Sequence, residues 1–123
     1  MLYVKTYIGP SKIHGTGLFA AEPIVKGAVV WRLIPRWDRI FLTEQIEQLP
    51  EHARAHLLIY GYVEKDKMIL CGDNAKFINH SASPTIHALP GWDNDDVAVR
   101  DIVVGEELTG DYRHFDFREH LFT

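Results

Sequence analysis

Short runs of β-branched and aromatic residues, each ended within a few positions by glycine or proline, are the feature that most restricts the fold of this chain. Runs of this length and composition are typical of strands, because an amphipathic helix needs a longer periodic pattern. We expect strands over residues 2–8, 27–34, 68–71 and 97–104. The first of these ends at Gly9-Pro10, where we expect a turn. The sequence therefore predicts a mostly β fold.

One stretch departs from this pattern and predicts a short helical insert at about residues 38–60. Thr43, followed by two glutamates, is typical of a helix N-terminus. Pro50 interrupts that helix, and residues 51–58 resume it with one apolar face. A length of 123 residues corresponds to one domain, which we expect to span residues 1–123.

Charge and cysteine content exclude several classes of protein. The net charge of −4 provides no basic surface for nucleic acid, so we expect no direct nucleic-acid binding. The single cysteine, Cys71, excludes an internal disulfide and a cysteine-rich zinc cluster. No apolar run is long enough to cross a bilayer, so we expect no membrane association. The simplest interpretation is a cytoplasmic protein in a reducing compartment, with secretion to a host nucleus left open.

A glycine pair near the N-terminus needs an explanation. Residues 15–20 read Gly-Thr-Gly-Leu-Phe-Ala, which matches the G-x-G-x-x-A pattern of dinucleotide-binding folds. That fold requires a helix to begin at the glycines, and Pro23 and Gly27 leave no room for one. As an isolated signal, the pair indicates a tight turn between two strands.

Two further segments carry clusters of polar residues. Residues 76–85 read Lys-Phe-Ile-Asn-His-Ser-Ala-Ser-Pro-Thr, and residues 105–112 read Gly-Glu-Glu-Leu-Thr-Gly-Asp-Tyr. Taken alone, the first is typical of a hydrogen-bonded turn and the second of a hairpin entering an edge strand.

In this order, the three segments closely resemble the SET-domain protein-lysine methyltransferase family. Its members carry a G-x-G loop, an R-F-x-N-H-S-C-x-P-N segment and a G-E-E-L-T-x-D-Y segment, and residues 60–62 match its Y-x-F strand more weakly. Lys76, Ala82 and Thr85 replace the family's usual arginine, cysteine and asparagine. Without the cysteines of flanking zinc clusters, the chain looks like a minimal, free-standing SET domain of bacterial or viral type.

The resemblance implies several small β-sheets, a short helical insert and a C-terminal pseudoknot. It also implies S-adenosylmethionine-dependent methyl transfer to the ε-amine of lysine. The backbone of the glycine loop would then pass close to the cofactor, and an aromatic near the C-terminus would cover the adenine, with Phe117 preferred to Phe115. The residues expected to bind the cofactor are His14, Gly15, Thr16, Gly17, Asn79, His80 and Phe117.

Tyr112 falls at the family's catalytic tyrosine, and Tyr60 is our second candidate for the lysine channel. The reaction needs a neutral amine, although the ordinary pKa of lysine is about 10.4. A sulfonium about 4 Å away disfavours the ammonium by about 4 kcal/mol at an effective dielectric near 20. That energy lowers the lysine pKa by about three units, so no general base is required. Tyr112 is left with the alignment of methyl and amine, while Tyr60 fits channel lining and core packing equally well.

The resemblance also implies a basic protein or peptide substrate, such as a histone-like, ribosomal or other lysine-rich tail. The alternative is a catalytically inactive SET-like module that binds proteins. The chain is expected to be a monomer or a homodimer. His52 and His56 have a spacing that can bind zinc, but they lack a clear third ligand and are typical of a solvated helix face, so we expect no metal.

Gly110 lies two residues before Tyr112, where the family usually has an aromatic residue. A tyrosine there tends to restrict the product to monomethyl-lysine. A glycine makes a restricted pocket harder to build, so the resemblance implies di- or trimethylation.

Overall fold

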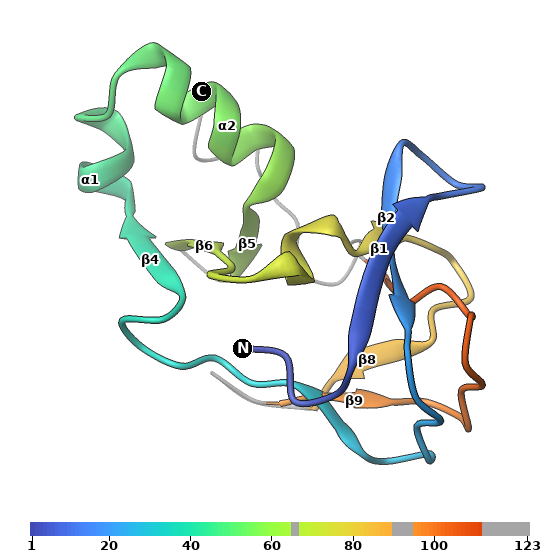
Figure 1. Ribbon diagram of the computed structural model, residues 1–123. Coiled ribbons are helices and arrows are strands. Elements are labelled where there is room, and N and C mark those ends of the chain that lie inside the picture. The colour runs from blue at the N-terminus through green and yellow to red at the C-terminus, as the bar shows by residue number, and fades with distance from the viewer. Residues whose placement is uncertain (65–66, 90–94, 112–123) are drawn as a thin grey trace.

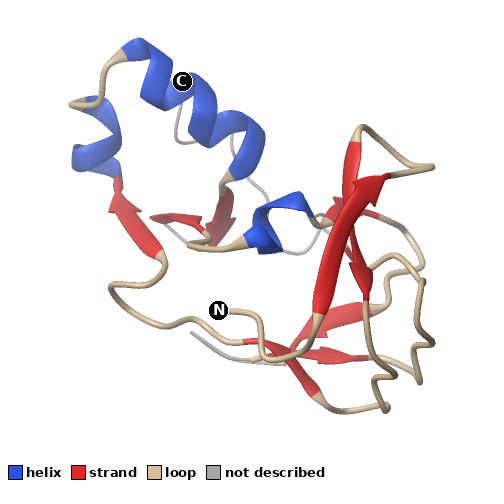
Figure 2. Ribbon diagram, viewed as in Figure 1, coloured by secondary structure: helices blue, strands red, loops and turns tan. Residues whose placement is uncertain are grey.

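The computed structural model describes residues 1–64, 67–89 and 95–111. Within these ranges, short strands dominate and form small sheets of two or three strands (Figures 1 and 2). The strands are β1 Thr6–Pro10, β2 Thr16–Ala20, β3 Val29–Trp31, β4 Arg39–Leu42, β5 Tyr62–Glu64, β6 Lys67–Leu70, β7 Asn79–His80, β8 Ile86–Ala88, β9 Asp96–Ala98 and β10 Thr109–Gly110. The helices are α1 Thr43–Glu47, α2 Glu51–Tyr60 and the 3-10 helix Asn74–Phe77. The mostly β fold predicted from the sequence is confirmed.

The elements fall into two groups, which Figure 1 shows side by side. In the first group, α1 and α2 lie beside the antiparallel sheet β4–β6–β5. In the second, the β1–β2 hairpin stands over the antiparallel sheet β3–β9–β8. In the described part of the chain, no helix is both long and apolar enough to cross a membrane.

The first strand lies later in the chain than the sequence predicts, because β1 spans Thr6–Pro10 and not residues 2–8. Gly9 and Pro10 belong to β1 and pair with Gly17 and Thr16, so the expected turn at Gly9-Pro10 is wrong. Proline is tolerated there because β1 is an edge strand of a two-stranded sheet. The chain reverses over residues 11–15, so Gly15 lies in the turn and Gly17 lies in β2.

Two other predicted strands are shorter in the structure. Gly27 has φ +85°, a left-handed conformation that delays β3 to Val29. The strand expected over residues 97–104 ends at Ala98, and the chain then bends. It returns to the sheet region through a single bridge between Ile24 and Ile102.

The helical insert contains the break that the sequence predicts. α1 begins at Thr43, and the side-chain oxygen of Gln45 accepts a hydrogen bond from the Leu42 N–H at its start (2.9 Å). α2 begins directly after Pro50, because proline has no N–H to donate to a preceding helical turn. The strand β4, which the sequence does not predict, precedes both helices inside the expected insert.

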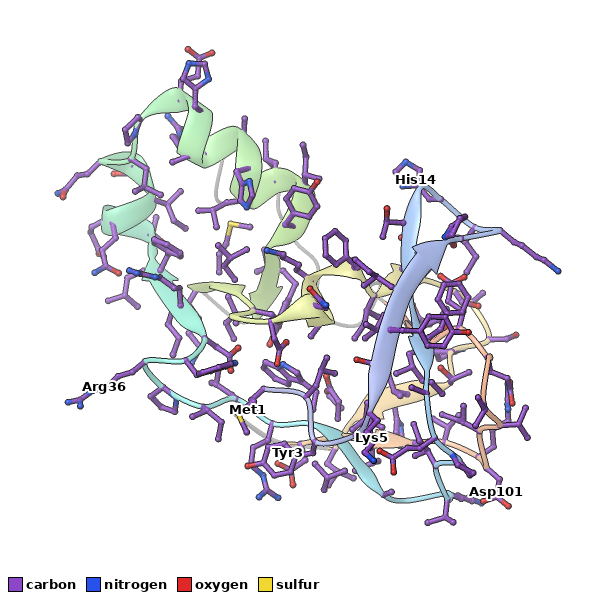
Figure 3. The ribbon with its side chains drawn as sticks, viewed as in Figure 1. Met1, Tyr3, Lys5, His14, Arg36 and Asp101 are labelled. Carbon is purple, nitrogen blue, oxygen red and sulfur yellow. The ribbon has the colours of Figure 1, made fainter. Side chains whose placement is uncertain are left out.

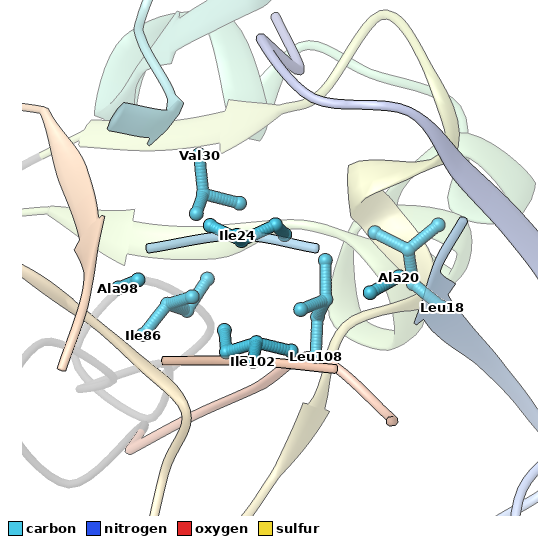
Figure 4. Close-up of a cluster of buried hydrophobic side chains, with 8 residues drawn as sticks. All are labelled: Leu18, Ala20, Ile24, Val30, Ile86, Ala98, Ile102 and Leu108. Atoms are coloured by element: carbon cyan, nitrogen blue, oxygen red, sulfur yellow. The ribbon is translucent and has the colours of Figure 1, made fainter. Parts of the chain in front are cut away.

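Three clusters of buried apolar side chains form the core. The largest joins β2, β3, β8 and β9 with the bridging segments (Figure 4); its members are Leu18, Ala20, Ile24, Val30, Ile86, Ala98, Ile102 and Leu108. The second contains Trp31, Ile69, Cys71 and Ala75, and burial raises the pKa of the Cys71 thiol. The third, made of Ile46, Leu57, Val63 and Met68, attaches the helices to their sheet.

The two-stranded parallel sheet of β7 and β10 positions the candidate site. Asn79 pairs with Thr109 and His80 with Gly110, and the Ser81 N–H donates to the Gly110 carbonyl (2.9 Å). This pairing places the Asn-His-Ser segment beside the Glu-Glu-Leu-Thr segment. The expected pseudoknot also involves the chain after β10, and from Tyr112 onward that chain lies outside the described residues.

Candidate functional site

Asn79 connects β7 to the turn between β1 and β2, which we call the hairpin turn (residues 11–16). Its side-chain nitrogen Nδ2 donates to the carbonyl oxygens of His14 (3.0 Å) and Thr16 (3.2 Å). The same nitrogen lies 3.1 Å from Oε2 of Glu107. Residues from all three sequence motifs therefore meet at one side chain.

Glu107 extends this contact to the start of the turn. Its oxygens Oε1 and Oε2 lie 2.8 and 2.9 Å from the Ser11 hydroxyl, which donates to the carboxylate. The same hydroxyl oxygen accepts from the backbone N–H groups of Ile13 (2.9 Å) and His14 (3.3 Å). We call Ser11, Asn79 and Glu107 the turn cluster.

The two glycines of the motif are required for different reasons. Gly15 has φ +48°, and a Cβ built on it would meet no atom within 4 Å. Its role is conformational, because the left-handed region favours glycine. A Cβ on Gly17 would lie 2.7 Å from Oε2 of Glu107 and 3.0 Å from Cβ of Ser11. Gly17 therefore leaves room for the turn cluster, a reason that the sequence alone did not suggest.

Of the sequence-predicted residues around the turn, Gly17 is buried and the other three are accessible. His14, Gly15 and Thr16 are exposed, and Figure 3 shows His14 at the tip of the hairpin. The His80 side chain is also exposed, and its Nδ1 lies 3.7 Å from Oδ1 of the buried Asp111. These residues expose main-chain polar groups at the turn and an imidazole on β7.

Tyr60 ends α2 and packs between two rings. Its ring lies 4.7 Å from that of His56 and 6.0 Å from that of Phe77, measured between centroids. Phe77 leads directly into the Asn-His-Ser segment, so Tyr60 joins the helical insert to that segment. The side chain remains partly exposed, which leaves channel lining and packing both consistent with its position. Tyr62 instead packs edge-on against Trp31 (6.1 Å) in the second core cluster.

Tyr112, Phe115 and Phe117 lie outside the described residues. The backbone before Tyr112 is nevertheless well placed, since Gly110 pairs with His80 and Asp111 is buried. Among the described residues, no group of three or more histidine, cysteine, aspartate or glutamate side chains is arranged to hold a metal ion.

Sequence reasoning missed two contributions to this site. The sequence around Ser11 does not indicate its role, because its partner Glu107 lies 96 positions away. Thr85, which replaces the family asparagine, exchanges hydrogen bonds with Thr109: each backbone N–H donates to the hydroxyl oxygen of the other residue (3.2 and 2.9 Å). The adjacent Glu-Glu pair was the available signal for Glu107, since successive residues of an extended strand face opposite sides.

The neighbouring Glu106 has a different environment. Its carboxylate pairs with the Arg100 guanidinium and accepts the Val103 N–H (2.9 Å). These contacts hold the pKa of the Glu106 carboxyl below its ordinary value. Glu106 and Glu107 thus stabilise two separate turns.

The comparison with known families agrees with this geometry. A family model described as the SET domain matches residues 15–113, which include the glycine loop, both polar segments and Tyr112. The chain belongs to the SET-domain family.

Several curated proteins have a similar SET domain. Human histone-lysine N-methyltransferase 2D is 31% identical over 123 aligned residues, which cover 94% of this chain and 2% of that protein. Histone-lysine N-methyltransferase trr of Drosophila melanogaster is 31% identical, over 94% of this chain and 5% of that protein. Histone H3-lysine(4) N-trimethyltransferase ATX1 of Arabidopsis thaliana is 31% identical, over 92% of this chain and 12% of that protein. The chain therefore spans a small part of each relative.

Solved structures share the SET fold. One is ctPRC2 in an autoinhibited conformation bound to S-adenosylmethionine, with a TM-score of 0.70 and 21% identity over 97% of this chain and 16% of that chain. Another is a humanized mutant of the Chaetomium thermophilum polycomb repressive complex 2, with a TM-score of 0.68 and 22% identity over 93% of this chain and 15% of that chain. At these identities the likeness concerns the fold alone.

Proposed function

We propose that this protein transfers the methyl group of S-adenosylmethionine to the ε-amine of lysine in a basic protein or peptide. One observation carries the proposal: the Asn79 side chain binds the carbonyls of His14 and Thr16 together with Glu107, so the three SET motifs assemble at one exposed turn. Relatives named as histone-lysine methyltransferases support the same activity.

The residues at the turn fit this cofactor. S-adenosylmethionine has an amino-acid end and an adenine, which main-chain N–H and C=O groups can bind. The carbonyls of residues 14–16 each accept one hydrogen bond within the protein and keep a second lone pair for a ligand. The exposed His80 imidazole adds a further polar group, and the open space beside Gly15 admits a ligand. We assign residues 14–17, Asn79 and His80 to cofactor binding, and Phe117 to covering the adenine. When bound, the cofactor supplies an activated methyl group on a sulfonium.

The chain's own residues then align the lysine. We assign this role to the Tyr112 hydroxyl, because Tyr112 falls at the family's catalytic tyrosine, two positions after β10 in the sequence. Tyr60 is held by His56 and Phe77, and we assign it to the wall of the lysine channel. Alignment of this kind contributes through the geometry of the attacking and leaving atoms, without a metal.

The net charge of −4 supports a lysine-rich substrate, because opposite charge favours encounter. We propose a histone-like, ribosomal or other basic tail as the substrate class. We also propose that the protein acts in the cytoplasm, as a monomer or homodimer.

Gly110 supports a proposal about the product. It is buried in β10, and its carbonyl accepts the Ser81 N–H, so its backbone is fixed beside β7. Because it brings no ring to the channel, we propose that the enzyme proceeds to di- or trimethyl-lysine. Mass spectrometry of a peptide product after long incubation tests this, and accumulation of monomethyl-lysine alone, with active enzyme and fresh cofactor, contradicts it.

The proposed activity is tested with purified protein, methyl-labelled cofactor and a panel of basic proteins, including histones. We expect labelled lysine in at least one of them, and Tyr112→Phe should lower kcat by about a hundredfold while leaving cofactor affinity unchanged. Tyr3→Phe is the matched control, because the exposed Tyr3 ring lies against the Arg32 guanidinium (5.1 Å) and has no assigned role in the site, so kcat should not change. Full activity of Tyr112→Phe would exclude the assigned role.

A further inference from the structure

We infer that Ser11 and Glu107 are positioning residues for cofactor binding, because with Asn79 they hold the hairpin turn in the shape that accepts the cofactor. This inference rests on the proposed function. By this inference, the affinity for the cofactor depends partly on two side chains that bind the turn and do not touch the cofactor.

The hairpin turn needs such support. Its residues 12–16 are exposed, so packing against the core does not fix their conformation. Gly15 adds freedom, since glycine adopts left-handed and right-handed conformations with similar ease. The Ser11 N–H donates to the Gly15 carbonyl (2.8 Å), which closes the turn but leaves the peptide groups between them to be held by side chains.

Ser11 holds the first half of the turn. Its hydroxyl oxygen accepts the N–H groups of Ile13 and His14, and its single proton goes to the Glu107 carboxylate. An alanine at this position would release two backbone donors and one carboxylate contact together. Each such bond stabilises the turn, and a bond to a charged group contributes more than a bond between neutral groups.

Asn79 and Glu107 hold the second half. The two Nδ2 protons of Asn79 are shared among the carbonyls of His14 and Thr16 and the carboxylate. Glu107 therefore orients the Ser11 hydroxyl, which accepts two backbone N–H groups of the turn. It also orients the Asn79 side-chain amide, which donates to two backbone carbonyls of the turn. Its carboxylate also lies where a side chain of Gly17 would be, which brings the turn cluster against the β2 backbone.

A turn held in one shape before binding loses less conformational entropy when the cofactor binds. Loosening the turn cluster should therefore raise the dissociation constant of the cofactor. It should leave the alignment of methyl and lysine, which we assign to Tyr112, unchanged once the cofactor is bound. The expected signature is a higher KM for the cofactor at nearly constant kcat.

The test compares two variants of the turn cluster with two control variants, all in the full chain. Ser11→Ala and Glu107→Gln are titrated with S-adenosylmethionine and with S-adenosylhomocysteine by calorimetry, beside wild type. Glu106→Gln is the control for charge. It changes the net charge as Glu107→Gln does, but at the adjacent residue, which pairs with Arg100. Ile46→Val is the control for stability, because Ile46 is buried in α1, in the group of elements opposite the hairpin (Figure 1). Thermal unfolding of each unliganded variant is recorded in parallel.

We expect Ser11→Ala and Glu107→Gln each to raise the dissociation constant about tenfold, which corresponds to about 1.4 kcal/mol. The double variant should be little weaker than either single variant, because the cluster acts as a unit. Both controls should bind as wild type does. If wild type binds and the two variants bind equally well, the inference is overturned; a fall in kcat with unchanged affinity also overturns it. If wild type binds neither ligand, the proposed function itself fails. Should Glu107→Gln fold poorly, Ser11→Ala decides alone.

Discussion

Two carboxylates stabilise this molecule in contrasting places, Asp38 inside the protein and Glu107 beside the hairpin turn. The Asp38 side chain is fully buried and binds the backbone N–H groups of Ile34 and Gly72 (both 2.9 Å) and the Met1 ammonium (3.0 Å). Glu107 is partly buried and binds the side chains of Ser11 and Asn79. The first carboxylate ties backbone to backbone, whereas the second shapes an exposed turn.

This difference predicts that Asp38 contributes mainly to folding stability and Glu107 mainly to ligand binding. Removing a buried carboxylate leaves its hydrogen-bond donors without an acceptor in a low-dielectric interior. Its loss should therefore reduce the stability of the whole fold. A carboxylate near solvent can be replaced by water at lower cost, so its loss should be detected mainly in ligand binding.

The largest effect is expected at Gly72, next to Asp38. A Cβ there would lie 1.9 Å from the carbonyl oxygen of Trp37, and a backbone atom cannot move aside as a flexible side chain can. Gly72→Ala should therefore lower the free energy of unfolding by about 4 kcal/mol, as measured by urea denaturation. Gly9→Ala is the control, because its Cβ would make an ordinary 3.6 Å contact with the Phe19 ring. Equal stability of the two variants would contradict the close approach.

Asp38→Asn should have the next largest effect. The amide keeps the size of the side chain but loses the charge that pairs with the Met1 ammonium, and its NH₂ would face a backbone donor. We expect a loss of about 3 kcal/mol in urea denaturation. Asp101→Asn is the control and should lose far less, because Asp101 is exposed and its side chain accepts the Lys26 N–H (2.8 Å) near solvent. A loss below about 1 kcal/mol for Asp38→Asn would remove the contrast between the two carboxylates.

Gly17→Ala should affect stability moderately and binding strongly. Its Cβ would overlap the Glu107 carboxylate, which is the far end of a side chain and can move. We expect a loss of about 1–2 kcal/mol in unfolding free energy. The displaced carboxylate should also weaken S-adenosylmethionine binding about tenfold or more. Unchanged affinity in a folded variant would show that the turn cluster does not shape the site.

The smallest effect is expected at Glu106. Its pKa is held below the ordinary value by Arg100, so the ionised form is favoured in the folded protein. The resulting stabilisation is present at neutral pH and is lost as the pH falls below about 4, through the lowered pKa. Because solvent screens this exposed pair, Glu106→Gln should lower the unfolding midpoint by less than about 3 °C at pH 7. Melting curves at pH 7 and pH 3 check this, and a difference that grew in acid would contradict the sign.

Local sequence patterns predicted much of the fold. Pro50 placed the break between the helices, and the short β-branched runs predicted small sheets. They failed where strand limits depend on tertiary contacts. Gly9-Pro10 signals a turn by composition, yet the pair lies in β1 because it is paired with Gly17 and Thr16 of β2.

The candidate site was predictable in part. The order of the three motifs identified Asn79 and the glycine loop, and the structure brings them together. The roles of Ser11 and Gly17 were not predictable, because both depend on a carboxylate that is distant in sequence. Asp38 likewise lies in an ordinary polar segment, and its burial becomes evident only when Gly72 and the first residues of the chain are placed around it.

The most direct test of this account is a calorimetric titration of the folded wild-type protein with S-adenosylmethionine, in the presence and absence of a chelator. We predict saturable binding with one site per chain, unchanged by the chelator, and a higher unfolding temperature when the cofactor is present. Absence of binding at millimolar cofactor, in protein shown to be folded, would contradict the central claim that the turn beside Asn79 is a cofactor site.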